Sequence, residues 1–167
     1  MKNIDIFLKN KQKKINVEAN LREIIFYSVR LVLCLEKFKN SAEISILLTD
    51  DEYIKNLNLK YKNKNFATDV LSFPTFKNGR YFKYDEKIVL GDVVISLEKA
   101  NEQFKKYFSS CVEEEVARLV IHAMLHLLSY DHEKGDVERN LMHKKEKILN
   151  NIVKRKFKFE RVNYYEN

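Results

Sequence analysis

The chain contains, at residues 122–132, the run HAMLHLLSYDH, which holds three of its four histidines. His122 and His126 are four residues apart, so on an α-helix they lie on one face, about 6 Å apart along the axis. Two imidazoles placed in this way can both reach one ion at metal–nitrogen distances of about 2.0–2.1 Å. His132 can join them only if the helix ends near Ser129 and the chain folds back, which the Ser-Tyr-Asp segment favours. The spacing therefore predicts a metal site at a helix end.

An alternative interpretation is that these histidines only pack along an amphipathic helix. A single His-x-x-x-His pair would favour that alternative, but a third histidine at such short range favours a metal. Three neutral imidazoles leave a fourth tetrahedral position for water, as in a catalytic zinc site. We therefore expect one Zn²⁺ per chain, held by His122, His126 and His132.

Length and composition favour one globular domain spanning residues 1–167. Hydrophobic residues make up 45% of the chain and charged residues 33%, and only three Gly and one Pro occur, which argues against linkers and disorder. The net charge of +7 favours a polyanionic partner such as RNA, although a solvated basic surface would give the same value.

The cysteines and the N-terminus indicate the compartment. Cys34 and Cys111 form no Cys-x-x-Cys motif and fall in helical patterns, so we expect two buried free thiols and a reducing environment. Residues 1–14 contain no apolar run long enough for a signal peptide or a membrane span. These features predict a cytoplasmic protein without membrane contact.

Hydrophobic periodicity predicts an α+β chain. Apolar alternation predicts strands at residues 3–8, 42–48, 68–73 and 88–96, and helical spacing predicts helices at 17–38, 51–59, 97–107 and 136–154, besides the histidine helix. Pro74 should end the third strand. Gly91 inside the fourth suggests a bulge or a close backbone approach.

Helix-end signals and helix faces give further expectations. Ser96 should cap one helix, and residues 110–113 form a capping box that should start the histidine helix. An apolar stripe on that helix predicts a core element with ligands on one flank, and it comprises Val112, Val116, Leu119, Val120, Ala123, Leu127 and Leu128. Four residues of the last helix should face inward, namely Val137, Leu141, Ile148 and Leu149. The basic and aromatic tail at 154–159 could stack on unpaired bases, but a fraying surface tail is favoured.

The residues around the histidines restrict the chemistry. The zinc protease motif places Glu, as general base, directly after the first His, and this chain has Ala123 there. Asp131 and Glu133 flank the third histidine and could accept a proton, although turn formation and plain solvation explain them equally well. A phosphodiester substrate would also need a cation to stabilise phosphate charge. The candidates for substrate binding are Lys62, Lys64 and Arg80.

Three motifs together resemble the YbeY family of bacterial endoribonucleases. They are residues 68–74 (TDVLSFP), residues 90–96 (LGDVVIS) and the histidine run, in family order. Met142, Glu146 and Leu149 in the last helix also look like the family.

This resemblance implies a compact fold with a four-stranded mixed sheet, about five helices and a zincin-like histidine helix. It implies zinc held by His122, His126 and His132, and a single-strand-specific RNase that matures the 3′ end of small-subunit (16S) rRNA and acts in ribosome quality control. RNA and the small ribosomal subunit with its proteins would be the partners, and no DNA is expected. It also places a catalytic Arg at the position of Lys62, and Lys lacks the fork that binds phosphate through two bonds.

Smaller departures from the family are Ala67 for Pro, Ala123 for Gly, and Ser129 for Gly at the helix end, where a left-handed residue is expected. Two other functions stay open. One is a metal-dependent hydrolase of peptides or amides, and the presence of Ala123 in place of the glutamate base argues against it. The other is a non-catalytic ribosome assembly factor with a structural metal, which Lys62 favours. The main hypothesis is a zinc endoribonuclease with His122 and Lys62 in the catalytic site.

Overall fold

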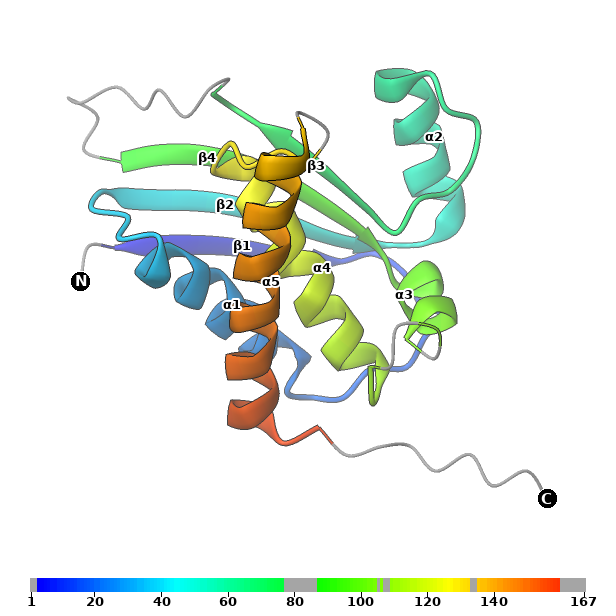
Figure 1. Cartoon of the computed structure of the whole chain (residues 1–167). Coiled ribbons are helices and arrows are strands. Elements are labelled where there is room, and N and C mark those ends of the chain that lie inside the picture. The colour runs from blue at the N-terminus through cyan, green and yellow to red at the C-terminus, as the bar shows by residue number, and fades with distance from the viewer. Residues whose placement is uncertain (1–2, 77–86, 105, 107–108, 133–134, 160–167) are drawn as a thin grey trace.

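The computed structural model describes residues 3–76, 87–104, 106, 109–132 and 135–159. These residues form a four-stranded sheet and five helices, which confirms the expected α+β class (Figure 1). The strands are β1 (Ile4–Asn10), β2 (Ser41–Thr49), β3 (Val70–Pro74) and β4 (Lys87–Ser96). The helices are α1 (Leu21–Leu35), α2 (Asp51–Lys62), α3 (Leu97–Gln103), α4 (Val112–Leu127) and α5 (Asp136–Phe157). No described helix is both long and apolar enough to cross a membrane.

The sheet is mixed and has the order β1-β2-β4-β3. β2 is parallel to both of its neighbours, β1 and β4, whereas β3 pairs antiparallel with β4. Parallel neighbours need a long crossover, and α1 supplies it between β1 and β2. The antiparallel β3 is left at one edge of the sheet, with a partner on one side only (Figure 1).

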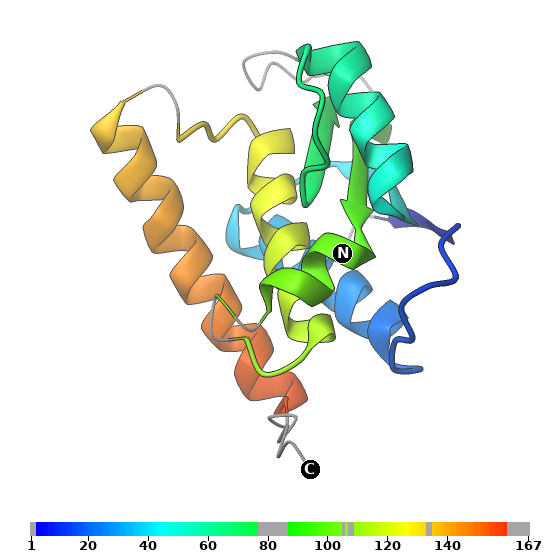
Figure 2. The same cartoon turned by 90° about the vertical axis from the view of Figure 1, so that its right-hand side faces the viewer.

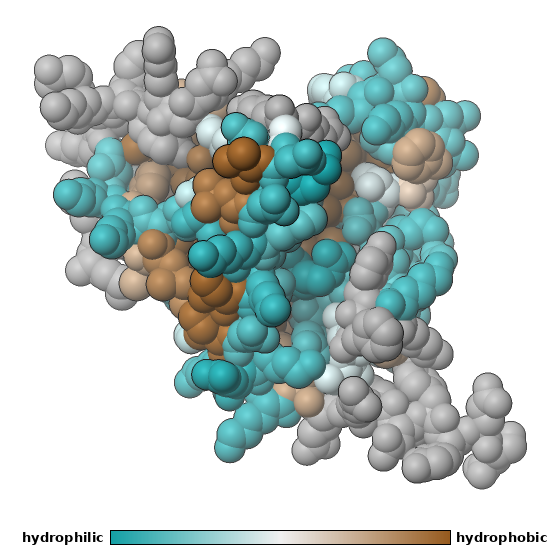
Figure 3. All heavy atoms as spheres, viewed as in Figure 1, coloured by the Kyte–Doolittle hydropathy of each residue, from teal (hydrophilic) through white to brown (hydrophobic). Residues whose placement is uncertain are grey.

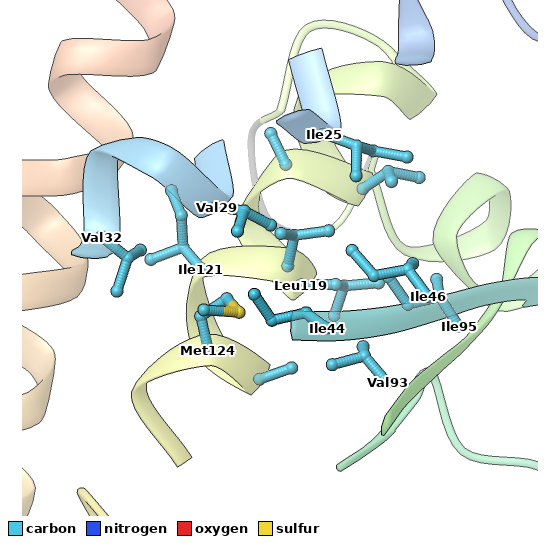
Figure 4. Packing of buried hydrophobic residues seen from close by; sticks show 14 of the residues in the cluster. Ile25, Val29, Val32, Ile44, Ile46, Val93, Ile95, Leu119, Ile121 and Met124 are labelled. Atoms are coloured by element: carbon cyan, nitrogen blue, oxygen red, sulfur yellow. The ribbon is translucent and has the colours of Figure 1, made fainter. Parts of the chain in front are cut away.

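The helices form layers on the two faces of the sheet. α4 packs against α1, α5 and the sheet, while α2 lies on the opposite face (Figure 2). In the core, Ile121 and Met124 of α4 lie among Val29 and Val32 of α1 and Ile44 of β2 (Figure 4). Twelve of the 16 residues of α4 are buried, so this helix is a rigid support for whatever its remaining residues carry.

Gly91 has the role that the sequence suggested. The pairing of β2 with β4 shifts by one residue at a bulge there, and Gly91 has a φ of 141°. A Cβ at this position would lie 2.2 Å from the carbonyl oxygen of Phe73. The expected bulge and close backbone approach are both confirmed, because only glycine fits this conformation and this contact.

The first predicted helix and the thiols need correction. α1 begins at Leu21 rather than near residue 17, and the N–H of Glu18, just before the helix, donates to the Glu113 side chain at 2.8 Å. The left-handed Lys37 ends the turn that follows α1. Cys34 is exposed and Cys111 is half-buried, so the prediction of two buried thiols is wrong.

Other element ends also differ. α2 continues to Lys62 and stops at the left-handed Asn63, so Lys62 lies on a helix and not in a loop. α3 ends at Gln103 rather than near residue 107. The prediction of a capping box at residues 110–113 is wrong, since Cys111 is the N-cap residue of α4 and makes no side-chain cap. Ser96 does cap α3, accepting from the N–H of Lys99 at 3.2 Å.

α5 buries a narrower stripe than predicted. Met142, Leu149 and Val153 are its buried residues, because α5 packs mainly on α1 and α4 and leaves much of its surface outside. The predicted inward positions other than Leu149 are exposed, namely Val137, Leu141 and Ile148. Figure 3 shows apolar surface among the hydrophilic side chains on the side of the molecule where α5 lies.

The predicted fraying tail is ordered. α5 extends to Phe157, whose ring packs edge-to-face on Tyr27 with centroids 5.4 Å apart. Phe159 stacks on Phe157 at 6.0 Å, and both rings contact the core. These rings therefore pack on the fold, which contradicts the fraying interpretation, while stacking on unpaired bases stays a prediction.

Candidate metal centre and its cavity

The residues of α4 that are not buried form one stripe at a spacing of four. They are Glu114, Arg118, His122 and His126. Since residues four apart lie on the same helical face, burial of the rest of the helix forces these side chains onto one line. The two histidines share that line, and their Nε2 atoms are 3.1 Å apart.

The chain folds back after α4 and brings the third histidine to the first two. Ser129 adopts a left-handed conformation with φ 72° and donates its N–H to the carbonyl of His126 at 2.9 Å. The ring of His132 then lies 5.1 Å from that of His126 and 5.5 Å from that of His122, between centroids. One ligand atom from each histidine lies within 4.8 Å of the others. The expected turn and the left-handed residue are both present.

A polar cluster from three elements holds this turn. The hydroxyl of Tyr130 donates to Glu36 Oε2 at 2.7 Å, and Lys145 Nζ donates to the other oxygen of Glu36 at 2.7 Å. The ammonium of Lys145 also lies 5.1 Å from the centre of the Tyr130 ring. Because Glu36 follows α1 and Lys145 lies on α5, the turn is fixed to two helices that are distant in the sequence. Sequence periodicity carries no signal for such a contact.

Glu146 of α5 sets the orientation of His122. Its Oε1 lies 2.7 Å from Nδ1 of His122. Burial would raise the pKa of Glu146, but the hydrogen bond to His122 and the charges of His122, His143 and Arg118 together lower it. An ionised carboxylate can only accept, so Nδ1 donates and Nε2 keeps its lone pair for a cation. The sequence reasoning named Glu146 but missed this role.

His126 is also prepared for a metal. Burial, followed by the nearby His122 and His132, lowers its pKa to about 4, so the ring is neutral near pH 7. Neutral imidazole is the form that binds transition metals. Three imidazoles with converging nitrogens, one of them oriented by a carboxylate, therefore fit a Zn²⁺-like ion better than a hard cation that prefers oxygen ligands.

The histidines open onto a cavity of about 600 Å³. Its walls come from the segment 68–72 with Pro74 and Phe76, from α4 and from the turn at 129–132. Asp69 and Asp131 are the carboxylates on these walls. Asp69 accepts from the N–H of Val70 at 2.8 Å and from the hydroxyl of Thr68 at 3.1 Å. Ala123 also lines the cavity, so the position of the protease base is apolar here.

The match to a family model decides which proteins this chain is related to. The model described as Endoribonuclease YbeY matches residues 7–153. The chain belongs to the YbeY family. Proteins named Endoribonuclease YbeY from Carboxydothermus hydrogenoformans and Caldicellulosiruptor bescii are similar to it. The first is 46% identical over 142 residues, covering 85% of this chain and 93% of the relative. The second is 39% identical over 153 residues, covering 88% and 96%.

A solved structure supports the fold. The solution structure of a Thermotoga maritima protein aligns with a TM-score of 0.64 at 23% identity and covers 98% of this chain and 99% of that one. The family resemblance drawn from the three motifs is thus confirmed, as is the mixed sheet that it implied.

The basic residues predicted to bind substrate do not all lie at the histidine cavity. Lys62, at the end of α2, lines the cavity with an exposed side chain. Lys64 is exposed but does not line the cavity, so the structure does not bring it to the histidines. Arg80 and Glu133 lie outside the described residues. Of the two described candidates for phosphate binding, only Lys62 therefore faces the site.

Proposed function

We propose that this chain is a metal-dependent endoribonuclease that cleaves single-stranded RNA. The observation that carries the proposal is the convergence of three imidazoles on an open cavity in a member of the YbeY family. The similar proteins carry the name endoribonuclease, and the net charge of +7 suits a polyanionic substrate.

His122, His126 and His132 would hold one Zn²⁺, with His122 oriented by Glu146. A divalent cation at this place would supply Lewis acidity to the reacting phosphodiester. Lys62 stands on the cavity wall and would bind a phosphate oxygen as a point charge. Lys64 and Arg80 would contact the RNA strand farther from the reacting bond. Pocket residues from β3 and the 129–132 turn would position the strand and limit water.

The physiological role that fits this activity is maturation of the 3′ end of small-subunit rRNA and quality control of ribosomes in the cytoplasm. The partners would be the small subunit and its associated proteins. This part of the proposal rests on the family relationship and on the basic character of the chain.

The test is a cleavage assay on purified protein. We expect cleavage of single-stranded RNA, loss of cleavage with a chelator, and its return when Zn²⁺ is added. A duplex of the same sequence and a peptide library serve as controls, and neither should be cleaved. Metal-dependent cleavage of peptides alone would favour the hydrolase alternative, and absence of any cleavage by the Zn²⁺-loaded protein would favour an assembly factor.

A further inference from the structure

β3 exposes part of its backbone on the wall of the histidine cavity. It is an edge strand of the sheet (Figure 1). Val70, Leu71, Ser72 and Pro74 all line the cavity together with His122 and His126. An unpaired strand edge offers backbone donors and acceptors to whatever enters beside it. The register of β3 decides which groups these are.

The register determines which backbone N–H and C=O groups of β3 point to its free edge rather than to β4. Ser96 N–H donates to the carbonyl of Asp69, and Thr75 N–H donates to that of Leu90, so both end residues bond to β4. In an antiparallel pair, hydrogen-bonded and non-hydrogen-bonded residues alternate. Leu71 and Phe73 therefore also bond to β4, and the backbone groups of residues 70, 72 and 74 point to the free edge.

Only one donor remains on that edge. The N–H of Val70 is already bonded to Asp69 Oδ1 at 2.8 Å, and Pro74 has no N–H. Among the described side chains and loops, none accepts the N–H of Ser72. The edge thus presents the carbonyl of Val70, the N–H and the carbonyl of Ser72, and the carbonyl of Pro74, in that order.

This set suits a base better than a peptide. A peptide strand gains affinity from a repeating series of main-chain bonds, which one free N–H cannot supply. Every nucleobase, by contrast, carries a donor beside an acceptor on its Watson–Crick edge, such as N6–H₂ and N1 of adenine or N3–H and O4 of uracil. One carbonyl and one N–H two residues farther along can bind such a pair.

We propose that the free edge of β3 binds the Watson–Crick edge of an unpaired base, with the Val70 carbonyl as acceptor and the Ser72 N–H as donor. Pro74 and Phe76 on the same cavity give apolar surface for the faces of the base. This inference rests on the proposed function and adds a reason for single-strand preference. A base within a duplex has this edge occupied by its partner, so the strand cannot enter the cavity. All four bases can make the contact, so little sequence selectivity follows from it.

The experiment uses three single-stranded oligouridines and the full-length, Zn²⁺-loaded protein. One RNA is unmodified, one carries N3-methyluridine at every position, and one carries 5-methyluridine. The two methylated RNAs have the same added atoms, but only the N3-methyl group blocks the Watson–Crick edge. We expect kcat/KM to fall about ten-fold for the N3-methyl RNA, since the Val70 carbonyl would lose its donor and face a methyl group, and to stay unchanged for the 5-methyl RNA. RNA binding to the protein should also be measured by fluorescence anisotropy in the presence of a chelator. It should be weaker for the N3-methyl RNA than for the unmodified and 5-methyl RNAs.

The outcomes separate this inference from the function itself. Equal cleavage and equal binding of all three RNAs would overturn the β3 contact while the endoribonuclease stands. Cleavage of none of them would overturn both.

A protein variant gives a second measurement. Ser72→Pro removes the outward N–H, and proline is tolerated at such a position of an edge strand. In this variant, kcat/KM for unmodified oligouridine should fall to the level of the N3-methyl RNA, with metal content unchanged. Thr75→Ala, at an exposed position just after β3, is the control and should keep the discrimination. Discrimination that persists in a folded Ser72→Pro protein would contradict the proposal, and if that variant does not fold, the RNA series alone decides.

Discussion

The two ends of α4 are built differently, although one stripe of side chains runs along both. At the N-terminal end, every polar group of the stripe has an opposite charge or a donor beside it. Arg118 makes a bond of 2.6 Å to the fully buried Glu115, and Lys154 lies 3.0 Å from Glu114. At the C-terminal end, two imidazoles face each other with Nε2 atoms 3.1 Å apart.

The difference separates stability from function. Paired charges at the N-terminal end anchor the helix, because the cation and hydrogen bonds of a buried carboxylate compensate the cost of removing it from water. At the C-terminal end, the imidazole nitrogens of three histidines converge instead. This convergence supports the proposal that the nitrogens share an ion. We therefore expect substitutions at the two ends to affect different measurements.

The largest effect is expected at the C-terminal end. His126→Ala removes a ligand, so RNA cleavage should fall by at least ~10³-fold, which corresponds to the several kcal/mol that a catalytic metal supplies. Zinc content measured by mass spectrometry should fall with it. His143→Ala, which removes the exposed fourth histidine, is the matched control. Retention of both metal and cleavage in His126→Ala would refute the three-histidine site.

The converse substitution is at the N-terminal end. Glu115→Ala leaves Arg118 and Ser109 without their bonds to a fully buried carboxylate. The free energy of unfolding should drop by about 2–3 kcal/mol, as measured by urea denaturation, while zinc affinity stays near that of the parent. Glu23→Ala, at an exposed position of α1, should change neither. A loss of zinc affinity comparable to that in His126→Ala would show that the two ends are not independent.

Glu146→Gln tests the orientation of His122. The amide cannot hold Nδ1–H as a carboxylate does, so zinc affinity should fall by about 10–100-fold, measured by competition with a chelating dye. The protein should remain folded, because Glu146 is only partly buried. Unchanged affinity would mean that the 2.7 Å contact does not prepare His122.

The pH dependence of the metal-free protein sharpens the comparison. His126 has a pKa of about 4 when folded and about 6.5 when unfolded, so the unfolded chain binds more protons between these values. Stability should therefore fall as the pH drops from 6.5 toward 4, by about 1 kcal/mol over the first unit. Urea denaturation at pH 7.5 and 5.5 would measure this change, and His126→Ala should reduce it. An equal loss in that variant would assign the effect to other groups.

The smallest effect concerns Lys62. Lys62→Arg gives the cavity a planar fork that binds two phosphate oxygens, so kcat/KM for RNA should rise by about two- to five-fold. Lys55→Arg, at an exposed position on the same helix that does not line the cavity, is the control. A decrease in the Lys62→Arg variant would show that the ammonium is itself the better fit.

Local patterns in the sequence were sufficient for much of this protein. The period of apolar residues located the strands and helices, because a buried face must recur every two or 3.6 residues. The His-x-x-x-His spacing determined that two imidazoles share a helical face, and Gly91 marked the bulge because no other residue tolerates its backbone. Helix ends were less predictable. α1 begins four residues later than predicted, and the segment before it bonds through Glu18 to Glu113, which is 95 residues away in the sequence.

Only the tertiary structure decided what surrounds the histidines. Glu146 reaches His122 from α5, and Lys145 of the same helix fixes the turn together with Glu36, which follows α1. These contacts depend on the packing of helices that are distant in the sequence. The same packing exposed Ile148 and buried Val153, because α5 lies mainly against α1 and α4. Sequence spacing thus specified which side chains could meet within one element. The position of each element against the others determined which of them do.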